Sequence, residues 1–133
     1  MGHTLSEATE SFRSSLDTIE RAYEFMLAYA AQGRATDEGQ QVGPSIRETL
    51  DELHAALDSI ADQVIAAQGD GANAGFTDAL RDDADKAAHS VKLALSCERI
   101  SSQLVDNLNA SIHLRAVLTG LFLADEALKI SSA

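Results

Sequence analysis

The sequence is poor in aromatic residues and in helix breakers. Tryptophan is absent, proline occurs once, and aromatic residues make up only 5% of the chain. A core with few rings must be built from Leu, Ile, Val and Ala, which suits close helix packing better than a β-sandwich. Hydrophobic residues reach 45% and charged residues 23%, values typical of a folded globular protein and not of a disordered one. We therefore expect one all-α domain over residues 1–133.

The sequence also lacks the features of secreted and membrane proteins. Its one cysteine, Cys97, cannot form a disulfide within the chain, so nothing requires an oxidising compartment. The longest charge-free apolar run, 116–124, is far shorter than the roughly 20 residues that span a bilayer. The first residues show no basic segment followed by an apolar stretch, so we expect no signal peptide. These absences predict a cytoplasmic protein.

Positive charge is scarce. The chain has ten Lys and Arg residues and 21 Asp and Glu residues, which gives a formal net charge of −11 at pH 7. An acidic chain repels phosphate backbones and anionic lipids. The balance therefore excludes nucleic acid and membrane surfaces as expected partners, while a cationic protein remains compatible with it.

The segment 5–32 predicts the first helix. Its apolar residues recur at alternating spacings of four and three, which marks one helix face. These residues are Phe12, Leu16, Ile19, Tyr23, Met26 and Ala30. Gly33 follows at the position expected of a glycine that ends a helix. The polar connection 33–43 is long for a helical bundle, and the sequence does not decide whether it is a binding element or slack.

A second helix is predicted after Pro44. Ser45 with Glu48 three residues later has the pattern of a capping box. The apolar positions again alternate by four and three, through Ile46, Leu50, Leu53, Leu57, Ile60, Val64 and Ala67. Gly69 is expected to end this helix, and 69–75 to form a flexible turn. Thr77 or Asp78 could then cap the next helix.

The stretch 76–130 contains no proline and only one glycine, Gly120. Its apolar pattern changes phase after Leu95, and an unbroken helix of this length would be roughly 80 Å long. We expect a break at Ser101-Ser102 or at Asp106-Asn107, with a slight preference for the second, because Ser, Asp and Asn favour caps. An unbroken, projecting helix is the alternative. Together the segments predict an up-down-up-down four-helix bundle whose third and fourth helices form one long or broken unit.

The last helix is apolar on all sides, which predicts burial on all sides. A four-helix domain offers each helix few neighbours, so the spare apolar surface predicts a subunit interface and a homo-oligomer, with a dimer as the first expectation. A central helix wrapped by the other three is the alternative. The expected interface residues here are Leu114, Val117, Leu118, Leu121 and Phe122. Phe25 and Tyr29, one turn apart and off the first helix's apolar face, are further candidates, because aromatic residues are enriched at interfaces. The alternative is that they cover the end of the bundle near Gly33.

The segment Ala88-His89-Ser90-Val91-Lys92 resembles the His-x-x-Lys core of histidine phosphotransfer domains, which are also four-helix bundles. The resemblance implies that His89 is an exposed phosphoacceptor and that Lys92, one turn later, stabilises the phosphoryl charge. It covers five residues. The sequence departs from the family after the lysine, where Leu93-Ala94-Leu95 replaces the usual glycine and small residues.

A ferritin-like metal site is a second alternative, because such bundles combine Glu-x-x-His pairs with further carboxylates. Only Asp51 and His54 have a comparable spacing, and Glu20 and Glu24 are the carboxylates of the first helix. All four flank the apolar faces and should point outward, so we expect neither a metal nor a cofactor. No nucleophile motif is present. The sequence therefore favours a non-enzymatic protein that acts by self-association and protein–protein binding.

Overall fold

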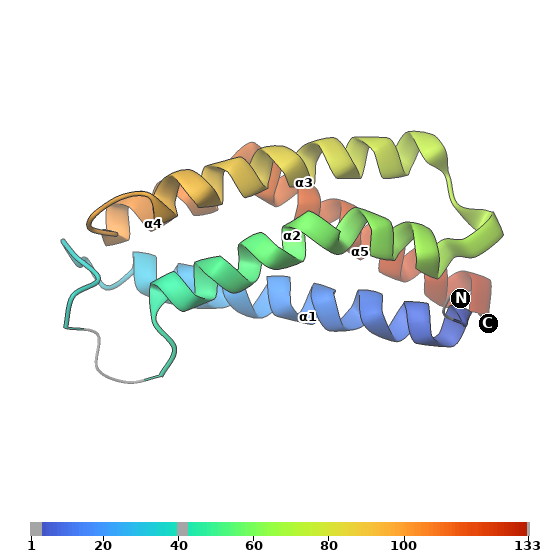
Figure 1. Cartoon of the computed structure of the whole chain (residues 1–133), viewed down its shortest axis with the longest axis horizontal. Coiled ribbons are helices and arrows are strands. Elements are labelled where there is room, and N and C mark those ends of the chain that lie inside the picture. Colours follow the sequence, from blue (N-terminus) through green and yellow to red (C-terminus); the bar gives the residue numbers. More distant parts are fainter. Residues whose placement is uncertain (1–3, 40–42, 133) are drawn as a thin grey trace.

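The computed structural model describes residues 4–39 and 43–132, and in this part of the chain the secondary structure is helical with no strand, as expected (Figure 1). Five α-helices and one short 3-10 turn pack together within it. They are α1 (Leu5–Ala30), α2 (Ile46–Gln68), η1 (Gly69–Gly71), α3 (Ala74–Leu95), α4 (Ser102–Asn109) and α5 (Ile112–Ser132). None of the helices in this part is long and apolar enough to cross a membrane.

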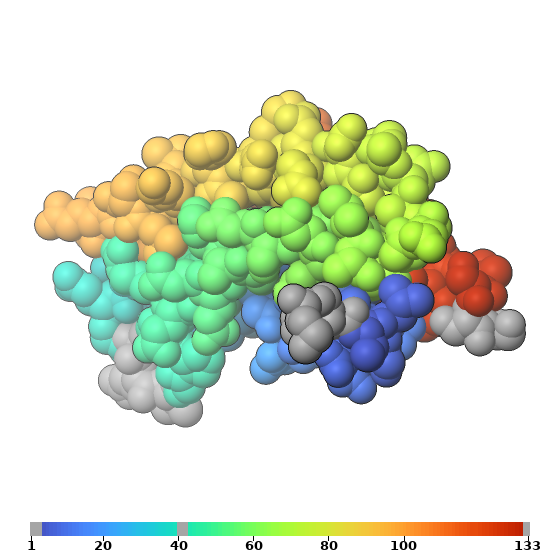
Figure 2. Space-filling model, turned by 45° about the vertical axis from the view of Figure 1, so that its right-hand side comes forward, coloured from blue at the N-terminus to red at the C-terminus, as the bar shows by residue number. Residues whose placement is uncertain are grey.

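Consecutive helices lie side by side. In Figure 1, α1 runs away from the end where α5 finishes, α2 returns, and α3 runs back alongside α2. The short α4 lies at the far end and packs against α1, and α5 then returns along α3. Figure 2 shows α2 and α3 together on one face, with the last turns of α5 close to the first turns of α1. The region between the helices is the hydrophobic core.

Local capping explains the limits of α1 and α2. The Thr4 hydroxyl accepts a hydrogen bond from the Glu7 N–H at 3.1 Å, and the Ser45 hydroxyl accepts one from the Glu48 N–H at 3.0 Å. Each bond satisfies a backbone donor that the first turn of a helix leaves free. Gly69 ends α2 with a φ of 56°, a conformation that only glycine adopts at low cost. The roles predicted for Ser45 and Gly69 are confirmed.

The core follows the predicted helix faces closely in α2 and less closely in α1. All seven apolar positions predicted for the second helix are buried. In α1, Ala22 and Tyr29 are buried where the pattern predicted Tyr23 and Ala30, which are only partly buried. Each fully buried Leu or Ile contributes about 1.5–3 kcal/mol through removal of apolar surface from water. Burial therefore supplies most of the energy that holds the helices together.

The cap of α3 lies four residues before Thr77 and five before Asp78, the two predicted cap positions. Asn73 caps the helix, with its side-chain oxygen accepting from the Phe76 N–H at 3.0 Å. Thr77 is buried inside the first turn, and its hydroxyl donates to the Asn73 carbonyl at 3.1 Å. The prediction of Thr77 or Asp78 as the cap is therefore wrong, because Asn73 supplies the same acceptor earlier in the chain.

The stretch 76–130 is broken twice. The first break lies at 96–101, where the Ser101 hydroxyl accepts from the Leu104 N–H at 3.0 Å and begins α4. The second lies at 110–111, after Asn109, whose side chain is buried at the end of α4. Asp106-Asn107, the preferred break in the sequence, lies inside α4, so that preference was wrong. The Ser101-Ser102 site, the other candidate, is where the chain restarts as a helix.

Candidate functional site

Most residues predicted to form an interface are part of this chain's own core. Leu114, Val117, Leu118 and Leu121 are all buried by contacts within the single chain. They line the inner side of α5, next to the other helices. An interface cannot use these side chains without opening the core, so they are removed from the candidate surface.

The outer side of α5 remains exposed, and it is apolar. Phe122 is 50% exposed, Leu123 61%, Ile130 70% and Ile112 77%. Half of the chain's eight exposed large hydrophobic residues in the described part therefore lie on this one helix. These exposed apolar residues explain why the sequence of the last helix is apolar on all sides. α5 buries one apolar stripe, and its solvent side carries four exposed apolar residues beside the polar residues Arg115, Thr119 and Glu126. We call the residues of this solvent side, 112, 115, 119, 122, 123, 126 and 130, the outer face of α5.

The outer face of α5 lies on a helix without net charge. Within α5, Arg115 and Lys129 balance Asp125 and Glu126, whereas the whole chain has a formal charge of −11. Lys129 contacts Asp125 at 3.3 Å and Glu126 at 3.9 Å. Arg115 is exposed and makes no ion pair with any described residue. The acidic charge of the protein is thus carried elsewhere, and an unpaired guanidinium stands among apolar side chains.

Asp125 does not belong to the outer face, because it joins α5 to α1. Its carboxylate accepts from the Arg13 Nε at 3.0 Å. Burial raises the pKa of Asp125, but the hydrogen bonds from Arg13 and Lys129 outweigh this effect and hold the pKa below its ordinary value. The ion pair therefore adds a polar contact between α5 and α1, while burial of Leu114, Val117 and Leu121 keeps the outer face turned away from the core.

Tyr29 is a core residue and not a surface aromatic, which corrects the prediction that it forms an interface with Phe25. It is 1% exposed, and its hydroxyl donates to the Ile100 carbonyl at 2.6 Å. Burial raises the pKa of the Tyr29 phenol. Phe25 is half-buried against the core. The sequence pattern missed the burial of Tyr29 because its partner lies 71 residues away along the chain.

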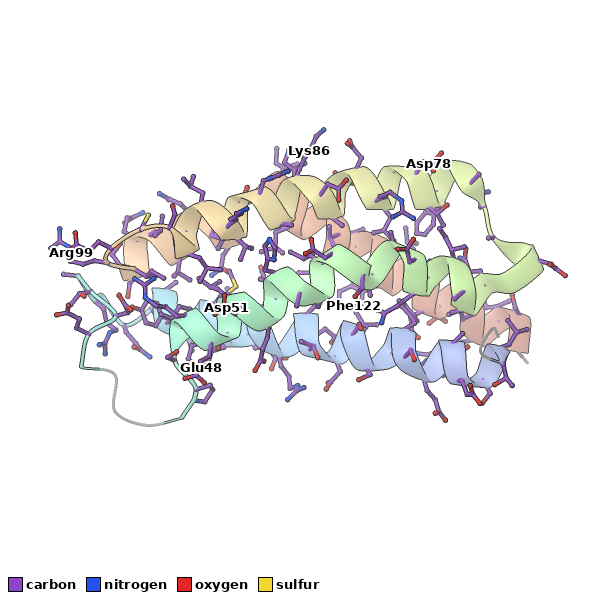
Figure 3. The ribbon with its side chains drawn as sticks, in the orientation of Figure 1. Glu48, Asp51, Asp78, Lys86, Arg99 and Phe122 are labelled. Atoms are coloured by element: carbon purple, nitrogen blue, oxygen red, sulfur yellow. The ribbon has the colours of Figure 1, made fainter. Side chains whose placement is uncertain are left out.

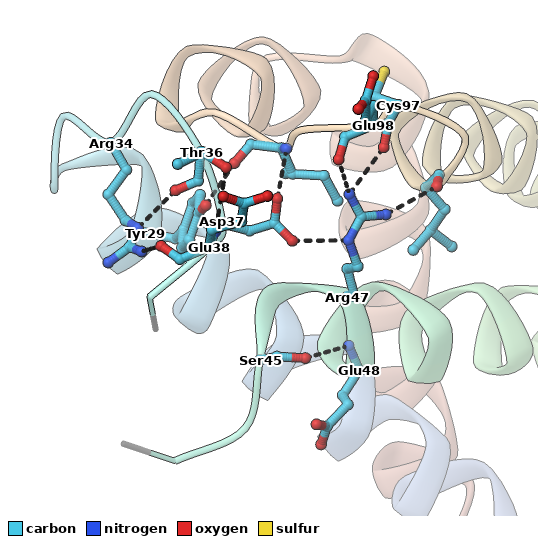
Figure 4. A network of polar contacts seen from close by, with 12 residues as sticks. Tyr29, Arg34, Thr36, Asp37, Glu38, Ser45, Arg47, Glu48, Cys97 and Glu98 are labelled. Atoms are coloured by element: carbon cyan, nitrogen blue, oxygen red, sulfur yellow. Dashed lines mark hydrogen bonds and ion pairs between the residues drawn. The ribbon is translucent and has the colours of Figure 1, made fainter. Parts of the chain in front are cut away.

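The connection after α1 is bonded to the connection between α3 and α4 (Figure 4). The Ser102 hydroxyl donates to the Tyr29 carbonyl at 2.7 Å and accepts from the Arg34 N–H at 2.8 Å. Arg34 also bonds the carbonyls of Thr36 and Glu38 through its guanidinium. These bonds order residues 31–39 as a structural element. The rest of the predicted 33–43 loop, residues 40–42, lies outside the described residues.

Arg47 and Asp37 form the centre of the same polar network. The Arg47 guanidinium donates to the Asp37 carboxylate at 2.8 Å and to the carbonyls of Leu95, Cys97 and Glu98 at 2.9–3.2 Å. It thereby satisfies carbonyls that the end of α3 leaves free. Burial raises the pKa of Asp37, but the Ile100 N–H and the Arg47 guanidinium outweigh it, so the pKa lies below its ordinary value. These groups are occupied with one another, as expected of a structural network.

His89 and Lys92 are both exposed on α3, as the resemblance to phosphotransfer domains requires. The neighbouring Leu93 is 67% exposed, so an apolar side chain stands beside the histidine. Figure 3 shows Lys86, one turn before His89, projecting from the outer edge of α3. Lys86 pairs with Asp82 at 3.0 Å, whereas Lys92 makes no ion pair with any described residue. The pair is accessible, but no pocket surrounds it.

The carboxylates and histidine weighed as metal ligands do not converge. His54 contacts Asp58 at 3.5 Å, on its own helix, and Asp51 and Glu24 are exposed. Figure 3 shows Asp51 on α2, and Glu20 lies on α1. Within residues 4–39 and 43–132, no three His, Cys, Asp or Glu side chains gather closely enough to hold a metal ion.

One hollow of about 600 Å³ lies where α1 begins and where α2 and α5 end. Leu5, Arg13, Gln68 and Leu128 are among its lining residues. The Gln68 side-chain oxygen is buried without a hydrogen-bond partner. A second hollow, of about 410 Å³, lies at the opposite end, where Gly33, Arg34 and Ser102 are among its lining residues.

Comparison with known proteins identifies no relative. No family model matches the chain, and neither a curated protein nor a solved structure is significantly similar to it. The candidate site is therefore carried by the side chains of this protein alone.

Proposed function

We propose that the chain is a four-helix bundle in which α4 and α5 together form a broken fourth helix. The support is the packing order, since α1 contacts α2, α2 contacts α3, α3 contacts α5, and α4 packs back on α1. Their alternating directions in Figure 1 fit an up-down-up-down path. In this arrangement α5 fills one corner of the bundle and has one side left over.

We propose that the protein is non-enzymatic and acts by self-association, and that the outer face of α5 is the contact surface. One observation carries this proposal. The helix with the most exposed large apolar side chains is also the helix whose charges cancel. Contiguous exposed apolar surface is costly in water and marks contact sites. Burying it recovers about 25 cal/mol per Å².

The charge distribution favours a second copy as the partner at this surface. Two chains of charge −11 repel each other, so they approach best through a region where the local charge is zero. The outer side of α2 carries Glu48, Asp51, Glu52, Asp58 and Asp62, and would oppose such contact. A closed symmetric dimer through one helix is the simplest assembly that covers the outer face of α5.

Light scattering after size exclusion tests this function. The wild-type chain is expected to elute as a dimer at tens of micromolar, and Phe122→Asp as a folded monomer with an unchanged circular dichroism spectrum. Leu93→Asp is the matched control, because Leu93 is as exposed as Phe122 but lies on α3. It should remain dimeric. A wild-type monomer, or a Phe122→Asp dimer, would contradict the proposal.

Phosphotransfer is the second candidate, favoured by the joint exposure of His89 and Lys92 one turn apart. In this reaction the His89 imidazole takes a phosphoryl group from a small phosphodonor, and Lys92 pairs with the added charge. An acid-labile mass gain that His89→Ala abolishes and Lys92→Ala reduces would support it. The matched control variant is His54→Ala, because His54 also lies on a helix surface. Labelling that persists in His89→Ala would exclude the role of His89.

A further inference from the structure

Five exposed positions on the outer face of α5 have the spacing of a coiled-coil seam, and two of them, Ile112 and Phe122, are apolar. The positions are Ile112, Arg115, Thr119, Phe122 and Glu126, and they follow one another at spacings of three and four. This alternation keeps side chains on one line along a helix. All five are exposed, and of these five Glu126 is the one that makes an ion pair with another described residue, at 3.9 Å from Lys129. From 112 to 130 the seam is about 27 Å long at 1.5 Å per residue.

The seam has an asymmetric charge pattern. Arg115 lies near its beginning and Glu126 near its end, with the apolar Phe122 between them. A parallel pair of such helices would place Arg115 against Arg115 and Glu126 against Glu126. Like charges in contact disfavour association. An antiparallel pair brings opposite charges together instead.

From this pattern we infer that two copies pair through α5 in antiparallel orientation, with Arg115 of each copy opposite Glu126 of the other. This inference rests on the proposed self-association and specifies its geometry. Facing positions in this register are Arg115 with Glu126, Thr119 with Phe122, and Ile112 with Lys129. The two-fold axis passes between Gly120 and Leu121. Leu123 and Ile130 widen the apolar strip on one side of the seam.

The structure supports the register in two further ways. Arg115 has no ion-pair partner within the described chain, so it is available to a carboxylate from a second copy. Glu126 has only the 3.9 Å contact to Lys129, between two exposed side chains, which is weak. The smaller Thr119 faces the larger Phe122, so large and small side chains alternate across the axis. In this register Arg115, Thr119, Phe122 and Glu126 pair among themselves, and Ile112 faces Lys129, one turn beyond Glu126.

Charge reversal tests the register. Sedimentation velocity is expected to show that Arg115→Glu and Glu126→Arg each raise the dimer Kd roughly tenfold, because each places like charges opposite one another. The double variant R115E/E126R restores opposite charges and should return the Kd to near the wild-type value. Lys92→Glu and Glu52→Arg are matched controls, because they make the same charge changes on exposed positions of α3 and α2. Both should leave the Kd unchanged.

Disulfide trapping provides a second readout. In a Cys97→Ser background, a chain with Ile112→Cys is mixed with a chain with Lys129→Cys and oxidised. The antiparallel register predicts a disulfide between the two different chains. A parallel pair would instead link Ile112→Cys to its own copy.

The outcomes separate the register from the function. One outcome would overturn the antiparallel register and leave self-association standing. In it, Phe122→Asp breaks the wild-type dimer, but the single charge reversals do not raise the Kd and the double variant does not restore it. A wild-type chain that stays monomeric at millimolar concentration would overturn both. Weakening by each single variant, recovery in the double variant and the mixed disulfide together would establish the pairing.

Discussion

Helices α2 and α5 have nearly the same length but opposite outer surfaces. α2 has 23 residues and α5 has 21, and each buries one apolar stripe in the common core. Away from the core, α2 is strongly acidic, whereas α5 is apolar and without net charge. The inner stripes explain the fold, and only the outer surfaces distinguish what the two helices can do.

The polar residues of α2 are partly used within the chain. Arg47 bonds Asp37 and the end of α3, and Asp62 bonds Arg81 of α3 at 2.6 Å. On α5, Asp125 bonds Arg13 of α1, and His113 contacts Asp83 of α3 at 3.3 Å. Arg115 and Phe122 make none of these bonds. The comparison indicates that both sides of α2 make contacts within the chain, whereas the outer face of α5 is free to bind a partner.

The largest expected effect separates the two faces of α5. Leu121 is fully buried and Phe122, its neighbour in sequence, is half exposed. Leu121→Ala should lower the free energy of unfolding by about 2–5 kcal/mol, because it leaves a cavity in the core. Phe122→Ala should change it by less than about 0.5 kcal/mol. Urea unfolding at concentrations where the chain is monomeric measures both, and equal losses would contradict the division into inner and outer faces.

An intermediate effect is expected for the two arginines. Arg47→Ala removes the partner of Asp37 and exposes the carbonyls at the end of α3, and should cost roughly 1.5–3 kcal/mol. Arg115→Ala removes no contact within the chain and should be nearly neutral in the monomer. The same unfolding measurement checks this pair. A neutral Arg47→Ala would mean that the network around Asp37 does not stabilise the fold.

The smallest effect concerns acid. Burial raises the pKa values of Asp37 and Asp125, but hydrogen bonds outweigh it and hold both pKa values below their ordinary values. The donors are the Ile100 N–H and Arg47 for Asp37, and Arg13 and Lys129 for Asp125. A lowered pKa contributes stability above the unfolded value of about 3.9, and this contribution is lost as pH falls through the folded pKa. Below about pH 4 the wild-type chain should therefore lose stability. Asp37→Asn and Asp125→Asn should each flatten the profile of melting temperature against pH in that range. Asp51→Asn, on the exposed side of α2, is the control and should keep the wild-type slope.

The sequence predicted α1 and α2 well because their signals are local. The alternating apolar positions, the Ser45 hydroxyl and the positive φ of Gly69 act within one or two helix turns. The positions of the helix breaks after Leu95 were predicted less well. The pair Asp106-Asn107 is compatible with a helix cap, but the helix is interrupted before and after this pair, at 96–101 and 110–111. Contacts with α1 and α3 decide the geometry there.

The candidate site was only partly visible in the sequence. The apolar character of α5 identified the correct helix, but four of its five predicted residues are buried and only Phe122 is exposed. Periodicity could not assign the two sides, because both have helical spacing. Packing against the other helices decides which side faces inward, and the ion pair of Asp125 with Arg13, 112 residues apart, adds a contact to it. Long-range pairs of this kind, like Tyr29 with Ile100, leave no pattern in a single sequence.

The most direct test of the account is an NMR dilution series on the wild-type chain, followed through methyl and aromatic signals. Self-association through the outer face of α5 predicts concentration-dependent shifts for Phe122, Leu123 and Ile130. The equally exposed Leu93 and Leu27 should not shift. Shifts confined to other helices, or no shifts up to millimolar concentration, would contradict the account.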